Sequence, residues 1–529
     1  MKKRPRHADA TLRSSAAPPQ FGPKTSRLAH NVISNWGAYF GALVVSFFLS
    51  PYLVSHLGNA GYGVWTLLLS LTGYLGLLDL GVRGAVTRYL AKFHAEADDR
   101  RASEVASSAL AIFGTSGLVA ISVSLALAFL AVNNLHIPPQ YLSAARLVVL
   151  LTGLSIALSL VGGVFGGILT GLQRFELING VEISMNLLRA LAIVTALRLG
   201  RGLVTLAVIQ LSITLARCAI NVALARRLYP ELRIRLSAVD RATIKLIFSF
   251  SIFSSLLHMS SSLIYASDNV VIGAYLPVAA VTFYVIGGNL VEYARQLSGG
   301  LSQTMTPLAS SIEARGPAAL QDLVLQGGRW ASMIILPVTC TFLLRGGSFI
   351  GLWQGQQYAG ISGRVLIVLS LTMIFSAPAF ATCSILLGLS RHKPIVPAML
   401  AEALCNLALS VFLVKRIGII GVAWGTAIPS LASSLIFWPW YIRRSLGIRP
   451  HAYLLSTWIR PAVALIPFLL GTYAVERFWP TPSLLVFFSQ VAFVLLLVLP
   501  GYWLICLTDE QRRQFSQRWS EMLAVPEGD

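Results

Sequence analysis

The segment Gly171-Leu172-Gln173-Arg174 recurs 217 residues later as Gly388-Leu389-Ser390-Arg391, and each copy ends a long apolar stretch. A second shared pattern follows each copy, because Glu182 precedes Asn186 by four residues, as Glu402 precedes Asn406. Repetition at a nearly constant offset indicates two equivalent halves. Transporters built from such repeats bind their substrate at the repeat interface, so the repeat predicts a transport site between the halves.

Apolar residues dominate the whole chain, which is 55% hydrophobic and only 12% charged. We therefore predict an all-α, polytopic membrane protein with about fourteen transmembrane helices, each near the roughly 20 residues that cross a bilayer. The predicted spans are 31–57, 63–88, 105–132, 143–170, 177–199, 203–226, 244–275, 280–309, 327–351, 362–388, 394–415, 418–443, 457–478 and 482–507.

These spans group into two pseudo-symmetric six-helix lobes, over 31–226 and 244–443, followed by two extra transmembrane helices over 457–507. Residues 1–30 are basic and lack the apolar surface needed to fold, so we predict a flexible cytoplasmic arm there. Residues 508–529 form a polar tail, which we also place in the cytoplasm.

The net charge of +20 raises the question of a nucleic-acid partner. Lys and Arg gather on alternate connections, together with both termini, which is the distribution of the positive-inside rule. The excess charge therefore predicts orientation in the membrane and attraction to anionic lipids, and no nucleic-acid binding. In the span 143–170 and just after it, Gly162, Gly163, Gly166, Gly167 and Gly171 form overlapping GxxxG patterns, which predict close helix packing.

The stretch Leu57-Gly58-Asn59-Ala60-Gly61-Tyr62-Gly63-Val64-Trp65 is followed by Leu77-Leu78-Asp79-Leu80-Gly81, Ala85, Arg88-Tyr89 and Ala91. This pattern resembles the second-helix signature of Wzx-type polysaccharide biosynthesis flippases, members of the multidrug/oligosaccharidyl-lipid/polysaccharide (MOP) exporter superfamily. In helix number, repeat and topology, the resemblance covers roughly residues 28–507.

The resemblance implies alternating access between two lobes and transfer of an undecaprenyl-diphosphate-linked glycan across the bacterial inner membrane. It implies a role in the biosynthesis of O-antigen, capsule or exopolysaccharide. The substrate and membrane lipids are the expected partners, and a polysaccharide polymerase or another enzyme of the same pathway is a further expected one. We expect no cofactor and no metal site.

Ionisable residues inside apolar spans are costly unless paired, so each one is a candidate for function. Asp79 and Arg83 are four residues apart, and Glu292 and Arg295 are three apart, so each pair can neutralise itself on one helix face. A structural role for these pairs remains open at this point.

Arginine binds diphosphate oxygens in bidentate fashion and keeps its charge at all physiological pH values. We therefore predict a substrate-binding set of arginines, with Arg295 and Arg217 as the principal members. The other members are Arg83, Arg88 and Arg189.

Asp268 has no basic residue within four positions, so we predict that it takes part in coupling or gating, together with Asp79 and Glu292. The alternative for Asp268 is a hydrogen bond to Asn269 or Tyr265, or an arginine partner on another helix. We expect Glu182 and Glu402 to be structural, and His258 to be a satisfied core residue.

The chain has no Gly-Lys dipeptide and therefore no P-loop for ATP. It also has no DxD or HExxH pattern, so metal catalysis is unsupported and we predict a transporter without catalytic residues. Three alternatives remain open: a cation-coupled multidrug exporter of the same fold, an O-antigen polymerase or ligase, and a non-transporting scaffold. The arginines favour an anionic substrate over the first, and the short outer connections argue against the second.

Overall fold

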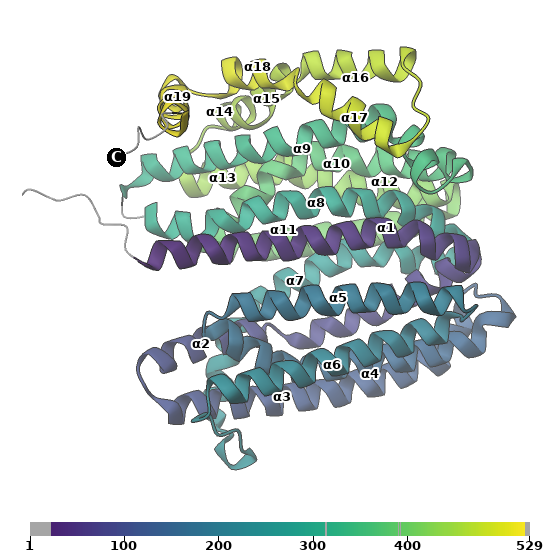
Figure 1. Ribbon diagram of the computed structural model, residues 1–529, viewed down its shortest axis with the longest axis vertical. Helices are drawn as coiled ribbons and strands as arrows, with labels where there is room; N and C mark the ends of the chain where they lie inside the picture. Colours follow the sequence, from purple (N-terminus) through teal and green to yellow (C-terminus); the bar gives the residue numbers. More distant parts are fainter. Residues whose placement is uncertain (1–22, 313–314, 390, 392, 524–529) are drawn as a thin grey trace, which may run out of the picture.

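The computed structural model describes residues 23–312, 315–389, 391 and 393–523, and this part of the chain is helical with no strand (Figure 1). The first half holds α1 (Pro23–Gly73), η1 (Tyr74–Asp79), α2 (Val82–Ala95), α3 (Asp99–Ala126), α4 (Pro139–Gly171), α5 (Phe175–Arg198) and α6 (Leu203–Leu228). The second half holds α7 (Arg241–Tyr275), α8 (Ala279–Ile312), α9 (Pro317–Trp353), α10 (Gln356–Gly388), α11 (Ile395–Ile417), α12 (Ile419–Ala432) and α13 (Trp438–Leu446). The remaining helices are α14 (Pro450–Leu454), α15 (Arg460–Ala464), α16 (Ile466–Phe478), α17 (Leu484–Leu495), α18 (Val498–Gly501) and α19 (Asp509–Leu523).

The long helices lie side by side with their axes roughly aligned, and they form two stacked groups, as Figure 1 shows. Helices α2 to α6 form one group and α8 to α13 the other, with α16 and α17 covering the outer side of the second. The start of α1 and helix α19 lie at the same end of the bundle. A layout in which every backbone group is bonded within its own helix is the one that hydrocarbon permits.

The two halves repeat the same packing arrangement. In the first half α1 packs on α5, α2 on α4, and α4 on α6, while in the second half α7 packs on α11, α8 on α10, and α10 on α12. Each helix of the first half therefore has a counterpart six helices later. The assignment of lobe boundaries at 31–226 and 244–443 remains a prediction.

The repeated Gly-Leu-x-Arg segment ends a helix in the same way in both halves. The amide of Arg174 donates to the carbonyl of Leu169 at 3.1 Å, and the amide of Arg391 donates to the carbonyl of Leu386 at 2.9 Å. A Cβ on Gly171 would lie 3.1 Å from the carbonyl oxygen of Thr87 on α2, and one on Gly388 would lie 2.4 Å from that of Thr306 on α8. The glycine therefore lets α2 approach α4, and lets α8 approach α10.

The glycines of α4 divide between two neighbouring helices. Gly163 and Gly167 face Arg83 and Val86 of α2, while Gly162 faces Cys218 of α6 at a distance that leaves no space for a Cβ. The packing role predicted for these glycines is confirmed for Gly162, Gly163, Gly167 and Gly171, whereas a Cβ on Gly166 would meet only Asn221, at 3.9 Å.

The break between the first two predicted spans is a single residue rather than a loop. Two helical segments meet inside α1 at Gly58, whose φ of 66° and ψ of 175° are not helical. The second half holds this turn, because Thr282 of α8 donates to the Asn59 carbonyl at 2.7 Å and the Tyr358 hydroxyl donates to the Asn59 side chain. A Cβ on Gly63 would lie 2.2 Å from the carbonyl oxygen of Val278. The segment Leu57–Trp65 is thus a contact between the two halves.

The connection from α6 to α7 is hydrogen-bonded to α3. Backbone amides of Arg233, Arg235 and Asp240 donate to the hydroxyls of Ser103, Ser107 and Ser108, at 3.0, 3.1 and 3.2 Å. Asp240 caps α7, and the hydrogen bonds from the Thr243 backbone and side chain lower the pKa of its carboxyl. The start of α7 is therefore anchored to the first half.

All fourteen predicted spans fall on helical segments. Among the described residues, ten helices are long and apolar enough to cross a membrane, or eleven when the bent pair Pro450–Ala464 and Ile466–Phe478 counts as one span. The difference arises partly because Phe40–Ala95 counts as one of these helices although it bends at Gly58, is interrupted at Leu80 and Gly81, and holds two predicted spans. The protein is an all-α polytopic membrane protein. Residues 1–22 of the predicted arm and 524–529 of the predicted tail lie outside the described residues, while α1 already begins at Pro23 and α19 occupies most of the tail.

Gly388→Ala tests the close approach of α8 and α10. The new Cβ would overlap the Thr306 backbone, so we expect a loss of about 1–3 kcal/mol, measured as a lower unfolding temperature in detergent. Gly360→Ala on the same helix is the matched control, because nothing lies within 4 Å of its Cβ position. Equal unfolding temperatures for the two variants would contradict this account of the repeat.

Candidate substrate-binding site

The second predicted span is interrupted where Asp79 and Arg83 lie. Asp79 ends the 3-10 helix η1, and Arg83 lies in the first turn of α2, after Leu80 (φ 49°) and Gly81 (φ 69°). Despite this break, Arg83 Nε lies 3.4 Å from Asp79 Oδ2. The predicted pair is present, but a turn connects its members instead of one continuous helix face. A mid-span 3-10 segment of this kind is typical of a hinge.

Arg83 rests on the glycine face of α4. A Cβ on Gly163 would lie 2.9 Å from Arg83 Nη2, so the missing side chain leaves room for the guanidinium. The Arg83 side chain keeps 50% of its surface exposed. Arg88 lies further along α2 and is also exposed.

Three charged side chains of α5 and α6 form a second group. Arg217 Nη1 donates to Glu182 Oε1 at 3.2 Å, and Arg217 Nη2 donates to the Ser159 hydroxyl at 3.5 Å. Arg189 lies close enough to interact electrostatically with both Arg217 and Glu182. The Cys218 thiol interacts electrostatically with both Arg217 and Arg83. Arg83 therefore lies near the group formed by Glu182, Arg189 and Arg217 in the first half.

Glu402, the repeat counterpart of Glu182, has different partners. It faces the hydroxyls of Ser430 and Ser433 at the end of α12 instead of an arginine. Both glutamates thus reach from the fifth helix of their half to the sixth, but among the described residues only Glu182 forms an ion pair with an arginine. The structural role expected for the two glutamates remains a prediction.

Arg295 is the principal cation of the second half. Its Nη1 lies 2.9 Å from Glu292 Oε2, and its guanidinium carbon lies 3.4 Å from the centre of the Tyr265 ring. Stacking on an aromatic face stabilises a guanidinium without removing its charge. The predicted ion pair on α8 is therefore present, and Arg295 also contacts Tyr265 of α7. The Arg295 side chain keeps 20% of its surface exposed.

Asp268 is the centre of a buried polar network, with only 3% of its surface exposed. Its Oδ2 accepts hydrogen bonds from Tyr284 of α8 and from Thr426 of α12, the latter at 2.8 Å. Thr426 in turn accepts from Asn406 of α11 at 3.1 Å. The partners are therefore neither Asn269 nor Tyr265, although the charge of Arg295 does act on Asp268. Among the described residues, no donor reaches Asp268 Oδ1.

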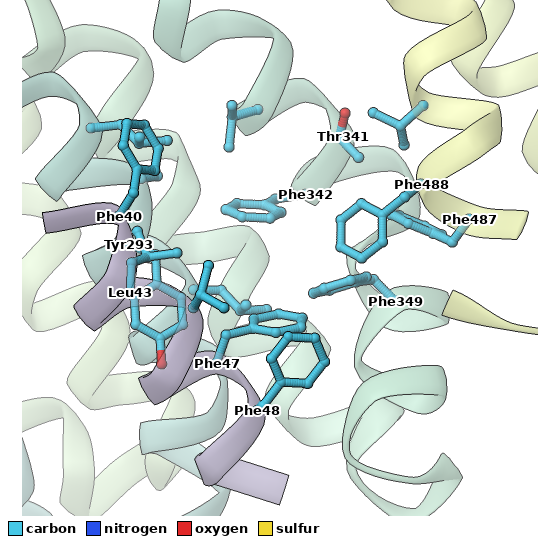
Figure 2. A pocket seen from close by; sticks show the side chains of 16 residues that line it. Phe40, Leu43, Phe47, Phe48, Tyr293, Thr341, Phe342, Phe349, Phe487 and Phe488 are labelled. Atoms are coloured by element: carbon cyan, nitrogen blue, oxygen red, sulfur yellow. The ribbon is translucent and has the colours of Figure 1, made fainter. Parts of the chain in front are cut away.

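An apolar groove with a volume of about 450 Å³ is lined by α1, α8, α9 and α17. Figure 2 shows aromatic rings of α1, α9 and α17 pointing toward one another around it, among them Phe47, Phe349 and Phe487. Its lining comprises Phe40, Leu43, Val44, Phe47, Phe48, Leu290, Tyr293, Ala294, Leu297, Val338, Thr341, Phe342, Phe349, Phe487, Phe488 and Val491. Helix α8 thus carries groove residues Ala294 and Leu297 in the same turns as Arg295.

A buried arginine that we did not predict supports this groove. Arg345 of α9 has 1% of its side chain exposed; its Nε lies 2.7 Å from Glu476 of α16, and its Nη2 lies 2.7 Å from Gln490 of α17. Its guanidinium lies 4.5 Å from the centre of the Phe487 ring, which lines the groove. An arginine within the apolar run 327–351, with a glutamate in another span, was the signal available in the sequence.

Within residues 23–312, 315–389, 391 and 393–523, no three His, Cys, Asp or Glu side chains form a group that could hold a metal ion.

Residues 28–313 match the model of the family described as polysaccharide biosynthesis protein. The chain belongs to this family. The match confirms the resemblance to Wzx-type flippases and identifies the chain as a transporter of the flippase type in polysaccharide biosynthesis, and not as an enzyme.

Similar proteins agree with this assignment. A candidate O-antigen transporter of Shigella flexneri is 25% identical over 400 residues, which cover 74% of this chain and 92% of that protein. The membrane protein EpsK of Bacillus subtilis (strain 168) is 20% identical over 432 residues, covering 80% of this chain and 85% of that one.

Solved structures share the fold of this flippase. The lipid II flippase MurJ in an inward closed conformation has a TM-score of 0.69 at 13% identity, with coverage of 94% of this chain and 100% of that chain. An inward-facing multidrug resistance MATE family transporter of the MOP superfamily has a TM-score of 0.62 at 16% identity, covering 76% and 94%.

Glu476→Gln tests the support of the groove. Removing the carboxylate leaves the buried Arg345 charge uncompensated, so we expect a loss of about 3 kcal/mol, measured as a lower unfolding temperature in detergent. Arg477→Gln changes the neighbouring charge and serves as the control. An unfolding temperature for Glu476→Gln equal to that of wild type would show that the ion pair is dispensable.

Proposed function

We propose that this protein moves a polyprenyl-diphosphate-linked oligosaccharide from the inner to the outer leaflet of the bacterial cytoplasmic membrane by alternating access. The observation that carries the proposal is that α8 presents two different faces over the same turns, an apolar one that lines the groove through Leu290, Ala294 and Leu297, and a charged one on which Arg295 stacks on Tyr265 of α7. An amphiphile with a long isoprenoid chain and a charged headgroup needs these two environments next to each other.

The lipid tail lies in the aromatic groove, where its apolar surface is removed from polar surroundings, and the diphosphate lies on the arginine side of α8. Guanidinium groups hold phosphate oxygens in bidentate fashion, so arginine specifies the diphosphate while the sugars are read loosely. Arg83, Arg189 and Arg217 supply further positive charge from the first half. The glycan occupies the space between the halves.

Coupling to an ion gradient goes through Asp268. This carboxyl is buried, has one oxygen without a donor among the described residues, and is within electrostatic reach of Arg295. When Asp268 takes up a positive charge, as a proton or a small cation, its attraction for Arg295 ends and Arg295 becomes available to the anionic substrate. Loading and unloading of Asp268 would thus alternate the affinity of the site.

Arg295→Ala tests the diphosphate site. Transfer of a fluorescent undecaprenyl-diphosphate oligosaccharide between leaflets of liposomes should fall by about tenfold to a hundredfold, because a charge-assisted contact is lost. Arg295→Lys should fall less, since the charge remains while bidentate binding is lost. Arg201→Ala, on an exposed connection, is the control.

If Arg295→Ala transferred the substrate as fast as wild type, Arg295 would not belong to the substrate site, but the assignment as a flippase would stand. No transfer by wild type, with export of a small cationic dye instead, would replace the proposal with a multidrug exporter of the same fold.

Asp268→Asn tests the coupling. The amide keeps the shape and cannot bind a proton or balance a cation, so stimulation of transfer by an imposed gradient should disappear. A pH gradient and a sodium gradient are imposed separately to identify the coupling ion, with Glu402→Gln as the control for a partly buried carboxyl. If either gradient still stimulated transfer by Asp268→Asn as strongly as transfer by wild type, another group would carry the coupling.

A further inference from the structure

A polar cavity of about 450 Å³ between η1, α2 and α7 belongs to the site already described, because Asp79 and Arg83 line it. His258 of α7 also lines this cavity, and its side chain is exposed there. The prediction that His258 is a satisfied core residue is therefore wrong.

A different polar pocket lies where the ends of α9 and α16 meet the start of α10. Its volume is about 440 Å³, a size typical of small-molecule sites. Its lining combines polar side chains, among them Gln356, Glu476 and Arg477, with the aromatic ring of Trp479. Figure 1 shows the connection from α16 to α17 at the end of the bundle opposite to α19. With both termini in the cytoplasm, as the charge distribution predicts, this pocket lies on the outer side of the membrane.

The buried Arg345 holds two of the lining residues in place. Its Nε lies 2.7 Å from Glu476 Oε2, and its Nη2 donates to the Thr481 hydroxyl at 2.9 Å. The hydroxyl of Ser348, which also belongs to the lining, donates to the other carboxylate oxygen of Glu476. Side chains held by such hydrogen bonds are pre-organised, because binding a ligand costs them little further entropy.

The remaining polar groups of the lining both donate and accept hydrogen bonds. A Cβ on Gly351 would lie 2.9 Å from the amide atoms of Gln356, so the glycine leaves room for this amide beside the pocket. Gln356 donates and accepts, Glu476 accepts and Arg477 donates. Neighbouring hydroxyls of a sugar also donate and accept, so this mixture suits a sugar better than a purely apolar or a purely anionic ligand.

Trp479 supplies an aromatic face beside these polar groups. It keeps 50% of its surface exposed, and its ring lies 6.4 Å from the ring of Phe493 of α17 in an edge arrangement. The C–H groups on one face of a pyranose ring carry partial positive charge, which the negative face of an aromatic ring attracts. An exposed indole next to fixed hydrogen-bonding groups is therefore the combination that a sugar ring requires.

We propose that this pocket binds a sugar ring of the glycan on the outer side of the membrane. Trp479 provides the stacking face, and Gln356, Glu476 and Arg477 bind the hydroxyls. The inference rests on the proposed function, which supplies the glycan, and adds a binding site outside the space between the halves. Helix α9 carries Ser348 of the pocket next to Phe349 of the aromatic groove, so the pocket adjoins the groove assigned to the lipid tail. A glycan bound there is less available for return to the inner leaflet.

The test measures binding of the free glycan, carrying a fluorophore, by fluorescence anisotropy. Mild acid releases this glycan from the undecaprenyl-diphosphate oligosaccharide of the transfer assay, so neither lipid nor diphosphate contributes to the affinity. The full-length protein is kept in a detergent without a sugar headgroup, because a maltoside would compete for the pocket. We expect saturable binding by wild type. Trp479→Ala and Gln356→Ala should each weaken binding by about three- to tenfold, the size of one stacking contact or one hydrogen bond.

Two matched controls lie outside the pocket. They are Gln357→Ala, next to Gln356 in the sequence, and Trp440→Ala, which removes an exposed tryptophan of α13. Both variants should bind the glycan as wild type does. Trp479→Phe should lose less affinity than Trp479→Ala, since an aromatic face remains.

Absence of saturable binding by wild type would overturn the inference, as would wild-type affinity in both Trp479→Ala and Gln356→Ala. In the latter case, a lower unfolding temperature of Trp479→Ala would assign Trp479 to anchoring at the membrane interface. Both outcomes leave the assignment as a flippase unchanged. If wild type bound the free glycan but did not transfer the lipid-linked oligosaccharide, the proposed function would be refuted while the sugar site would stand.

Discussion

The structure depends on one close contact, made twice, between the backbones of two helices at a glycine. Gly171 admits α2 against α4, and Gly388 admits α8 against α10. Between apolar helices in lipid there is little hydrophobic driving force, so association depends on such close packing. The two helices that this contact positions are those that carry Arg83 and Arg295. The packing rule that builds each half therefore also places one of its candidate substrate-binding arginines.

Two buried charged side chains of the described bundle, Arg345 and Asp268, differ in how far their neighbours compensate them. Arg345 is compensated by Glu476, Thr481 and Gln490, and holds α16 and α17 against α9. Asp268 is only partly compensated, because Tyr284 and Thr426 both donate to the same oxygen. A fully compensated charge is suited to a structural role, whereas a partly compensated one is suited to binding and releasing an ion.

The halves share a packing plan but differ in chemistry. Arg83, Arg189 and Arg217 concentrate positive charge in the first half, whereas the second half pairs Arg295 with the buried carboxyl of Asp268. Two equivalent positions of the repeat show this divergence. Glu182 forms an ion pair with Arg217, whereas Glu402 faces serine hydroxyls. Under the proposed function, the first half attracts the anion while Asp268 of the second half responds to an ion gradient.

From the sequence alone, the all-helical membrane fold, the repeat and most of the glycine packing of α4 could be predicted, because hydropathy and periodicity act locally along the chain. The fourteen predicted spans fall on helices, but among the described residues only ten or eleven helices are long and apolar enough to cross a membrane. The ion pairs of Asp79 with Arg83 and of Glu292 with Arg295 could also be predicted, since three- and four-residue spacing brings side chains together. Contacts between distant helices could not be predicted, because one sequence carries no information on helix rotation. Only the tertiary structure decided that Arg217 binds Glu182, that Asp268 binds Tyr284 and Thr426, that Arg345 is buried behind the groove, and that His258 faces a cavity instead of the core.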